Sequence, residues 1–339
     1  MSAQPDGSDH AIHYVVRAAI TAPSLHNSQP WLFVGRGGDI LLYADLTRRL
    51  PSTDPNGREL VVSCGAALFN LRLAMRHLGF RPVVHPLPTP RLPRLLAQVS
   101  WGAYARPTAG EELLYRAMRE RRTHRGPFQS TPLPAPLIEA LRLQALAEGA
   151  ELHTVVDPAQ QHRLAAVVHR AESFQRSDPD CTAELMGWTQ PHRSCRYDGV
   201  PSEATPFHPD SALLAGRDFT GWSRPSRGDG SAGPLLTRTG LVALLNTPRD
   251  TPQDWLRAGQ ALQRVLLYAT SHTISAGFHT QPLEIPSLRA DIRTMIPSRQ
   301  SPQMILRLGH TNWTWRTPRR PVEDVMLADV PPRACPLDV

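Results

Sequence analysis

The sequence has 339 residues, enough for two ordinary domains or one large domain. Its 37 basic residues are all arginine, against 30 acidic residues, and the formal net charge is +7. Because lysine is absent, Schiff-base chemistry and a phosphate-binding P-loop are excluded. A basic balance can serve an anionic ligand or nucleic acid. The chain has no basic stripe with interleaved aromatic residues, so we do not expect nucleic acid as a partner.

The cysteines and the apolar segments narrow the class of protein further. The four cysteines include no Cys-x-x-Cys pair, so we expect neither a disulfide framework nor a metal site. No apolar run approaches the ~18 residues that a membrane span needs. The polar N-terminal segment lacks the charged and then apolar pattern of a secretory signal. These features predict a cytoplasmic protein with no membrane partner.

In chain order, apolar residues at helical spacing predict a first helix that starts near Ser8 and stops before Pro23. A glycine-rich hairpin signal follows at 35–39. The first third of the chain is further expected to contain strands at 31–34 and 40–43, a helix capped by Ser63 and closed by Gly79, and extended runs at 83–86 and 95–101.

Residues 103–110 resemble a connection between two halves, because they combine proline and glycine between regular patterns. Periodicity fails over 176–234, and a loop of that length is usually functional or disordered, so we interpret it as an insert. The remaining expected elements are a helix leading into Arg121, helices at 136–148 and 159–174, a helix starting at Thr251, and strands at 151–156, 241–246 and 304–306.

Two helical segments echo each other. Cys64–Leu68 and Ala258–Leu262 both combine a glycine with alanines on one face, which lets another helix approach closely. The similarity could be chance. We favour a diverged tandem duplication, because each half also opens with a helix followed by a strand. The expected halves are 1–106 and 107–339, with 176–234 a lid or insert in the second half.

A cluster of arginines follows the third expected helix. Arg121, Arg122 and Arg125 surround Thr123, and the rigid guanidinium fork fits phosphate oxygens in pairs while the hydroxyl adds a neutral donor. Taken alone, the cluster is more typical of a solvated basic helix end than of a phosphate site. A second polar stretch, Pro23–Trp31, favours the phosphate interpretation and a single composite site between the halves.

Together, Arg-Arg-Thr-x-Arg and Pro-Ser-x-x-Asn-x-Gln-Pro-Trp resemble the nitroreductase family of FMN enzymes, and more closely its tandem, Acg-type members from actinobacteria. The resemblance implies an α+β fold of mostly antiparallel sheets flanked by helices, with one FMN at the interface of the two halves. It also implies that the insert is a lid over the flavin. Supporting stretches are 54–60, 64–74, 121–128, 198–201, 259–262 and 281–284.

The resemblance carries cofactor-binding roles onto named residues. We give no acid–base role to His26 or His124, and Arg307 is a weaker candidate for a flavin contact. For Asn27 and Gln29, bracing of the loop competes with direct contact to the cofactor. The expected contacts are Arg121, Arg122, Thr123 and Arg125 to the phosphate, ribityl chain and pyrimidine edge, Pro23, Ser24 and Leu25 against the ring, Pro282, Leu283 and Glu284 near flavin N5, and Arg319 and Arg320 near the phosphate.

Two functions are consistent with these residues. The first is an FMN-dependent oxidoreductase that passes electrons from NAD(P)H to a small nitro, quinone or other acceptor; the flavin supplies the redox chemistry, so no catalytic side chain is required. The second is a non-catalytic protein that binds and sequesters FMN beneath its lid. In either case, a chain that carries both halves is expected to act as a monomer rather than a homodimer.

Overall fold

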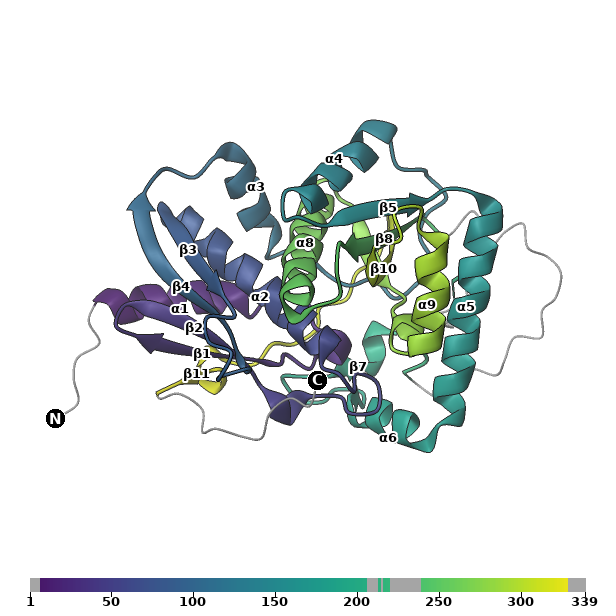
Figure 1. Ribbon diagram of the computed structural model, residues 1–339, viewed down its shortest axis with the longest axis horizontal. Coiled ribbons are helices and arrows are strands. Elements are labelled where there is room, and N and C mark those ends of the chain that lie inside the picture. The colour runs from purple at the N-terminus through teal and green to yellow at the C-terminus, as the bar shows by residue number, and fades with distance from the viewer. Residues whose placement is uncertain (1–6, 206–212, 215, 220–238, 329–339) are drawn as a thin grey trace.

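The computed structural model describes residues 7–205, 213–214, 216–219 and 239–328. Two larger sheets stand on either side of a central pair of long helices, α2 (Arg58–His77) and α8 (Pro252–Ser271), as Figure 1 shows. All strand pairs of these sheets except one are antiparallel. The expected α+β class with mostly antiparallel sheets is therefore confirmed.

The first sheet contains the predicted hairpin of the N-terminal region. Its strand order is β11-β1-β2-β4-β3, and only the β1–β11 pair is parallel. The last described strand, β11, thus adds to the first sheet. After the second sheet, the chain therefore returns to the first sheet on the other side of the central helices (Figure 1). The strands are β1 (Trp31–Arg36), β2 (Asp39–Ala44), β3 (Phe80–Pro86), β4 (Leu95–Tyr104) and β11 (Met326–Leu327).

The second sheet has the order β5-β8-β10-β9 and is antiparallel throughout. All nine residues of β10 are buried, because helices and neighbouring strands cover it on every side. Thr123 adds an isolated parallel bridge to Ala276 of β9, which attaches the arginine stretch to this sheet. The strands are β5 (Glu151–Val155), β8 (Leu241–Thr247), β9 (Ser275–Phe278) and β10 (Ser301–Gly309).

The remaining helices cover the two sheets. In Figure 1, α5 and α9 lie along the outer side of the second sheet, and α1 lies beside the first. They are α1 (Gly7–Ala19), α3 (Ala109–Ala117), α4 (Ala135–Leu146), α5 (Pro158–Ser177), α6 (Pro179–Gly187) and α9 (Pro286–Met295).

The helix starts show where local sequence signals suffice. Thr251 caps α8 as predicted, because its hydroxyl accepts a hydrogen bond from Asp254 N at 3.3 Å. The predicted cap at Ser63 is wrong. The helix α2 begins five residues earlier, at Arg58, and Ser63 lies inside it with its hydroxyl donating to Glu59 O at 2.7 Å. The polar side chains of Arg58 and Glu59 are buried, so the first turn is invisible to an apolar pattern.

The stretch 176–234 is more ordered than expected. It contains α6, a small parallel pair of β6 (Thr189–Gln190) with β7 (Val200–Pro201), and the last turn of α5. The expectation of an irregular segment is therefore wrong for 179–187, where Asp178 caps the helix through Asp180 N at 2.8 Å. Residues 206–212, 215 and 220–238 of the predicted lid lie outside the described residues.

The echoed segments form the crossing of the two central helices. A Cβ atom on Gly65 would lie 2.3 Å from Leu256 O, and one on Gly259 would lie 1.9 Å from Val62 O. Neither helix could carry a side chain at these positions without moving away from the other. The predicted close approach of small-residue faces is confirmed. A duplicated origin, and the boundary between 1–106 and 107–339, stay predictions.

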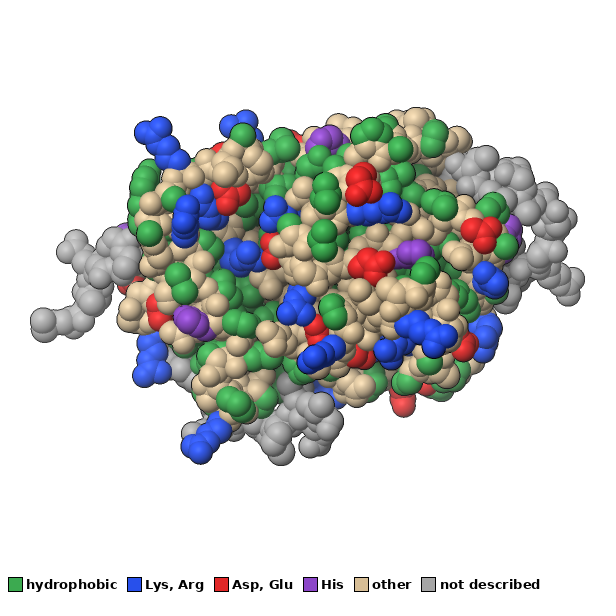
Figure 2. Space-filling view, turned by 45° about the horizontal axis from the view of Figure 1, so that its top comes forward, with side chains coloured by type: hydrophobic (Ala, Val, Ile, Leu, Met, Phe, Trp, Pro, Cys, Tyr) green, Lys and Arg blue, Asp and Glu red, His purple; other side chains and the backbone are tan. Residues whose placement is uncertain are grey.

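The surface gives no sign of one continuous basic stripe on the face in Figure 2, where arginine side chains are scattered and several lie beside acidic ones. Within the described ranges, no helix is both long enough and apolar enough to cross a bilayer. The cytoplasmic location stays a prediction.

Replacing Gly259 with alanine should lower the free energy of unfolding by roughly 1–3 kcal/mol, because the new methyl group overpacks the α2–α8 crossing. Gly110→Ala in α3 is the matched control: nothing lies within 4 Å of its Cβ position, so stability should be unchanged or slightly raised. Chemical denaturation of the two variants measures the difference. Equal stability of both variants would contradict the close crossing.

Candidate functional site

The loop that follows α1 is held in an unusual backbone conformation. His26, Asn27 and Gln29 have φ angles of 49°, 57° and 52°, a region that side-chain-bearing residues occupy only at a cost of about 1–3 kcal/mol each. Such a conformation persists only where the surroundings fix it. Ser24 Oγ accepts from Gln29 N at 2.9 Å, and Leu25 N donates to Ser63 Oγ of α2 at 3.3 Å.

Asn27 and Gln29 brace this loop against two distant segments. Asn27 Nδ2 donates to Gly199 O at 3.0 Å and to Pro318 O at 3.1 Å. Gln29 Nε2 donates to Tyr197 O at 2.7 Å. Both amides are buried and directed away from the cavity described below, so the bracing interpretation of these residues agrees with the geometry.

The arginine stretch is attached to the second sheet by its backbone. Arg121 N donates to Ala117 O at 2.9 Å as the helix α3 ends, and His124 N donates to Ala276 O of β9 at 2.8 Å. Gly277 is required beside it, because a Cβ atom there would lie 2.9 Å from His124 O. The sheet edge therefore fixes the direction in which Thr123 and Arg125 project.

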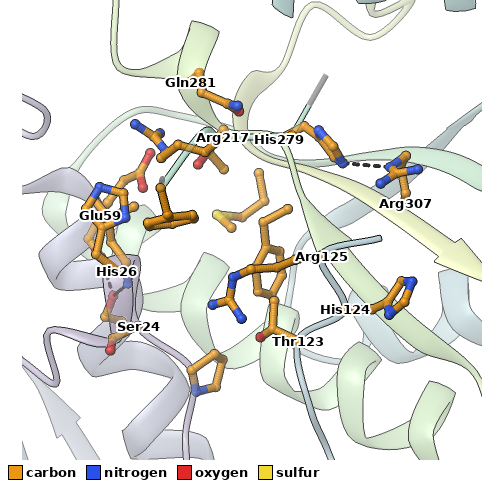
Figure 3. Close-up of a pocket in the computed structure, with 18 of the residues that line it drawn as sticks. Ser24, His26, Glu59, Thr123, His124, Arg125, Arg217, His279, Gln281 and Arg307 are labelled. Carbon is orange, nitrogen blue, oxygen red and sulfur yellow. Dashed lines mark hydrogen bonds between the residues drawn. The ribbon is translucent and has the colours of Figure 1, made fainter. Parts of the chain in front are cut away.

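The loop and the arginine stretch meet across one cavity. Figure 3 shows Ser24, His26 and Glu59 on one side and Thr123 and Arg125 on the other. The N-terminal end of α2, the end of β9 and the segment 216–219 complete the wall. The lining residues are Pro23, Ser24, Leu25, His26, Glu59, Val62, Ser63, Thr123, His124, Arg125, Gly126, Thr205, Gly216, Arg217, Phe219, Leu262, Phe278, His279, Thr280, Gln281, Met304 and Arg307.

Several nitrogens of Arg125, which lines this cavity, and of two arginines on which its charge acts are buried without a hydrogen-bond partner. They are Nε and Nη1 of Arg121, Nη1 of Arg125 and Nε of Arg319. Burial, followed by the charges of Arg122 and Arg125, lowers the pKa of Arg121 to about 9. Burial alone lowers the pKa of Arg125 to about 10. Burying a charge without a counter-charge is costly, so these donors fit an anion that the chain itself does not supply.

The tail that leads to β11 contributes to the same positive region. Burial lowers the pKa of Arg319, and the charges of Arg121, Arg122, Arg125 and Arg316 lower it further. We call these five residues the arginine cluster. Arg319 Nη1 donates to Asn27 Oδ1 at 2.9 Å. Within the described ranges, no carboxylate oxygen lies within 4.0 Å of a guanidinium nitrogen of Arg319, Arg121 or Arg125. A phosphate monoester matches this set of donors.

Two of the predicted contacts, Arg320 and Arg122, do not line the cavity, whereas the weaker candidate Arg307 does. Arg320 donates to Gln29 O at 3.2 Å and to Asp324 O at 2.6 Å, and it lies 3.6 Å from a carboxylate oxygen of Asp45. It therefore braces the loop. Arg122 is half-buried, and its guanidinium donates to Arg121 O at 2.8 Å. Arg307, the weaker candidate, lines the cavity and donates to His279 Nε2 at 2.6 Å.

Pro282, Leu283 and Glu284, which were expected to lie near flavin N5, do not line the cavity. The four residues before them, Phe278–Gln281, line the cavity. Leu283 packs among apolar residues, and Glu284 turns away to pair with Arg217 at 2.5 Å. The 3₁₀ turn η4 (Gln281–Leu283) reverses the chain after β9, so only its first residue faces the cavity.

Sequence reasoning assigned no role to most of the cavity wall, and four polar or aromatic residues stand out among those it missed: His26, Arg217, Phe219 and Glu59. His26 lies next to the motif and its ring packs edge-on against Phe219, with ring centres 5.4 Å apart. Phe219 also lies 5.7 Å from the Arg125 guanidinium. Arg217 and Phe219 belong to the stretch without periodicity and gave no signal. Glu59 belonged to the stretch 54–60, which entered only as support for a resemblance.

The buried acids and imidazoles of the wall have shifted pKa values. Burial, followed by the charge of Glu284, raises the pKa of Glu59 to about 8, although Arg58 Nη2 lies 2.6 Å from its carboxylate. Burial lowers the pKa of His26, and the charges of Arg217 and Arg125 lower it further. At neutral pH the cavity therefore presents a neutral imidazole and a carboxyl group that retains its proton.

No protein-family model matches the chain. Relatives in Mycobacterium tuberculosis align over nearly its whole length. The protein named "Putative NAD(P)H nitroreductase acg" is 31% identical over 327 residues, which cover 93% of this chain and 94% of the relative. The uncharacterized protein Rv3127 is 32% identical over 320 residues, covering 92% and 91%. This chain belongs to the nitroreductase family. The expected resemblance to Acg-type members is confirmed.

Among solved structures, the FMN-dependent nitroreductase NfnB from Mycobacterium smegmatis, in complex with NADPH, is similar over 65% of this nitroreductase chain and 99% of its own. The sequence identity is 20% and the TM-score 0.39, which are too low to support a statement about this site.

Replacing Arg121 with methionine should raise the free energy of unfolding of flavin-stripped protein by roughly 1–4 kcal/mol, because the change removes a buried charge that has no partner. Arg58→Met is the matched control, since Arg58 is equally buried but its guanidinium donates to Gln303 O at 2.8 Å and to the Glu59 carboxyl group at 2.6 Å; its loss should be destabilising. Denaturant unfolding in a buffer free of phosphate and sulfate measures both. Destabilisation of equal size would show that Arg121 already has a counter-charge.

Proposed function

We propose that this nitroreductase-family protein is an FMN-dependent oxidoreductase that binds one FMN between the loop 23–29 and the arginine stretch 121–125. The observation that carries the proposal is a set of buried, unpartnered guanidinium nitrogens on Arg121, Arg125 and Arg319. Arg125 lines the shared cavity, and its charge acts on both Arg121 and Arg319. A phosphate would supply the missing counter-charge. The names of relatives as NAD(P)H nitroreductases support the same activity.

The residues present fit the cofactor's chemistry. Arg121, Arg125 and Arg319 would neutralise the phosphate, and the Thr123 hydroxyl would add a short donor. A flavin ring needs apolar walls with a few polar groups, and the cavity has both. The apolar part of the wall comes from Pro23, Leu25, Val62, Leu262, Phe278 and Met304.

When bound, FMN would accept electrons from NAD(P)H and pass them to a small nitro, quinone or similar acceptor. The contribution of this chain is to bind, orient and enclose. The loop 23–29 is fixed by its hydrogen bonds before any ligand arrives, so little conformational entropy is lost on binding. Such a rigid wall favours one orientation of the ring.

We infer that the site is a composite of two diverged halves, 1–106 and 107–339, within one monomer. Pro23–Leu25 and Glu59 come from the first half and Thr123–Arg125 from the second, and both line the same cavity. The crossing at Gly65 and Gly259 has the close approach that a pseudo-symmetric pair of helices would show. A lone site with no equivalent copy would give one FMN per chain.

The second candidate is a non-catalytic protein that sequesters FMN. The described part of the predicted lid favours it in one respect. Arg217 forms an ion pair with Glu284 and donates to Gln175 Oε1 at 3.0 Å, and its side chain is only 10% exposed. This anchor holds Phe219 at the cavity, where it would restrict access to a bound ring.

Steady-state oxidation of NADPH by the FMN-loaded protein, with a nitroaromatic or a quinone as acceptor, separates the two functions. We expect acceptor-dependent NADPH oxidation, because relatives that align over nearly the whole chain are named NAD(P)H nitroreductases. A flavin that dithionite reduces and that neither NADH nor NADPH reduces would establish sequestration instead.

Replacing Arg121 and Arg125 together with methionine should weaken FMN binding by roughly 3–6 kcal/mol, since each charge-assisted contact to phosphate is worth about 1.5–3 kcal/mol. That loss corresponds to about 10² to 10⁴ in the dissociation constant. The matched control replaces Arg81 and Arg91, which are exposed and remote from the cavity.

Absorbance of the purified proteins gives the flavin content, and fluorescence titration gives the dissociation constant. Wild type and control should hold one FMN per chain and the double variant none. Retention of FMN by the double variant would place the phosphate elsewhere, and two FMN per chain would reveal a second site.

A further inference from the structure

Glu59 occupies a position in the cavity that the proposed binding of FMN does not explain. It lies in the first turn of α2, its side chain is 3% exposed, and it lines the wall beside Ser24 and His26 (Figure 3). Burying a carboxyl group costs free energy unless the group is paired and hydrogen-bonded. The only hydrogen bond to its side chain in the described structure comes from Arg58 Nη2, at 2.6 Å.

The charges around Glu59 are unbalanced. Facing it are the carboxyl groups of Asp54 and Glu284 and the guanidinium groups of Arg58 and Arg217. Arg217 is already paired with Glu284 at 2.5 Å. On the α9 side, Arg289 is paired with Asp250, which its two Nη atoms contact at 2.7 and 2.8 Å, and adds no free positive charge.

Three buried carboxyl groups therefore lie beside Arg58 and Arg217, of which Arg217 is already paired with Glu284. The charge of Arg49 also acts on Asp54. The negative charge around Glu59 is reduced when one of the three carboxyl groups keeps a proton. Like charges that share a site cannot all ionise. Arg58 Nη1 also donates a hydrogen bond to Gln303 O at 2.8 Å, so fewer of its N–H groups remain to bond the Glu59 carboxyl group. Burial and Glu284 accordingly raise the pKa of Glu59 to about 8.

The other titratable groups of the wall are poor proton donors at neutral pH. Burial lowers the pKa of His26 and of His124, so neither imidazole carries an extra proton. His279 Nε2 accepts a hydrogen bond from Arg307 Nε at 2.6 Å, which requires that nitrogen to be unprotonated. The guanidinium groups of Arg125 and Arg307 keep their protons, since their pKa values remain at about 10.

We propose that Glu59 is the proton donor to the electron acceptor that is reduced in this cavity. The proposal rests on the proposed oxidoreductase function and adds a catalytic residue to it. For a quinone, reduction to the hydroquinone consumes two electrons and two protons. The quinone takes two electrons and one proton from the reduced cofactor, and its second oxygen takes the other proton from the Glu59 carboxyl group.

The departing proton leaves a carboxylate that Arg58 stabilises across 2.6 Å. A new proton can reach it from solvent. Arg58, Asp54 and Glu284 also line a second cavity, on the side toward α9, which offers water a place next to the buried carboxyl groups.

The test compares FMN-loaded wild type with Glu59→Gln, which keeps a polar side chain of the same length and loses the acidic proton. Each protein is reduced with dithionite and mixed with duroquinone, and the rate of flavin reoxidation is followed by absorbance. We expect a fall of roughly 100-fold or more, the usual contribution of a general acid. Glu112→Gln, remote in α3 and paired with His77, is the matched control and should keep the wild-type rate.

A readout independent of turnover is the infrared band of a protonated carboxyl group. The wild-type protein at pH 7 should show this band, which should fade as the pH rises through about 8 and be missing from Glu59→Gln. Glu284→Gln should lower the pH at which the band fades, because it removes the neighbouring negative charge.

The possible outcomes distinguish a failure of the Glu59 proposal from a failure of the proposed FMN-dependent function. Equal reoxidation rates for wild type and Glu59→Gln, both with FMN bound, overturn the role of Glu59 alone. Identical carboxyl bands for the two proteins at pH 7 do the same, and that comparison does not depend on how well the variant reacts. A wild-type chain that retains no FMN overturns both proposals.

Discussion

The contact on which the structure depends is the crossing of α2 and α8. At this crossing the two backbones come so close that a single methyl group on Gly259 would meet Val62 O at 1.9 Å. Because the sheets lie on opposite sides of this pair, the crossing sets the distance between them (Figure 1). It also places Glu59 and Ser63 of one helix and Leu262 of the other along the same cavity wall. The site is therefore a consequence of how the helices pack.

Much of the fold follows from local sequence signals. Thr251, Pro252 and Asp254 start α8 through the physics of a helix N-terminus, and the glycines between β1 and β2 allow the hairpin. The failures differ in cause. The helix α6 has a local start signal in Asp178 and Pro179, but it lies within a stretch whose apolar pattern is irregular. The first turn of α2 is made of charged residues whose burial depends on distant partners such as Gln303, so no local pattern reveals it. Short strands such as β11 likewise form only because they pair with a strand that is distant in the sequence, here β1.

The site divides in the same way. Motif positions located Pro23–Leu25 and Thr123–Arg125, whose side chains converge although about a hundred residues separate them. They could not separate Arg319, which joins the arginine cluster, from Arg320, which braces the loop, since the two differ only in the direction of the side chain. Arg217 and Phe219 were beyond reach, because residues in an aperiodic stretch acquire meaning only from tertiary contacts.

The return of the C-terminal tail to the first sheet has a mechanical consequence. Phe33 N donates to Val325 O at 2.7 Å, so the last described strand fastens the sheet that the chain built first. The segment between β10 and β11 thus connects the two sheets, and neither sheet can unfold without releasing it. Thermal denaturation should consequently be a single cooperative event. Because this connecting segment also carries Arg319, proteolytic cleavage within it would destabilise the fold and weaken the anion site at the same time.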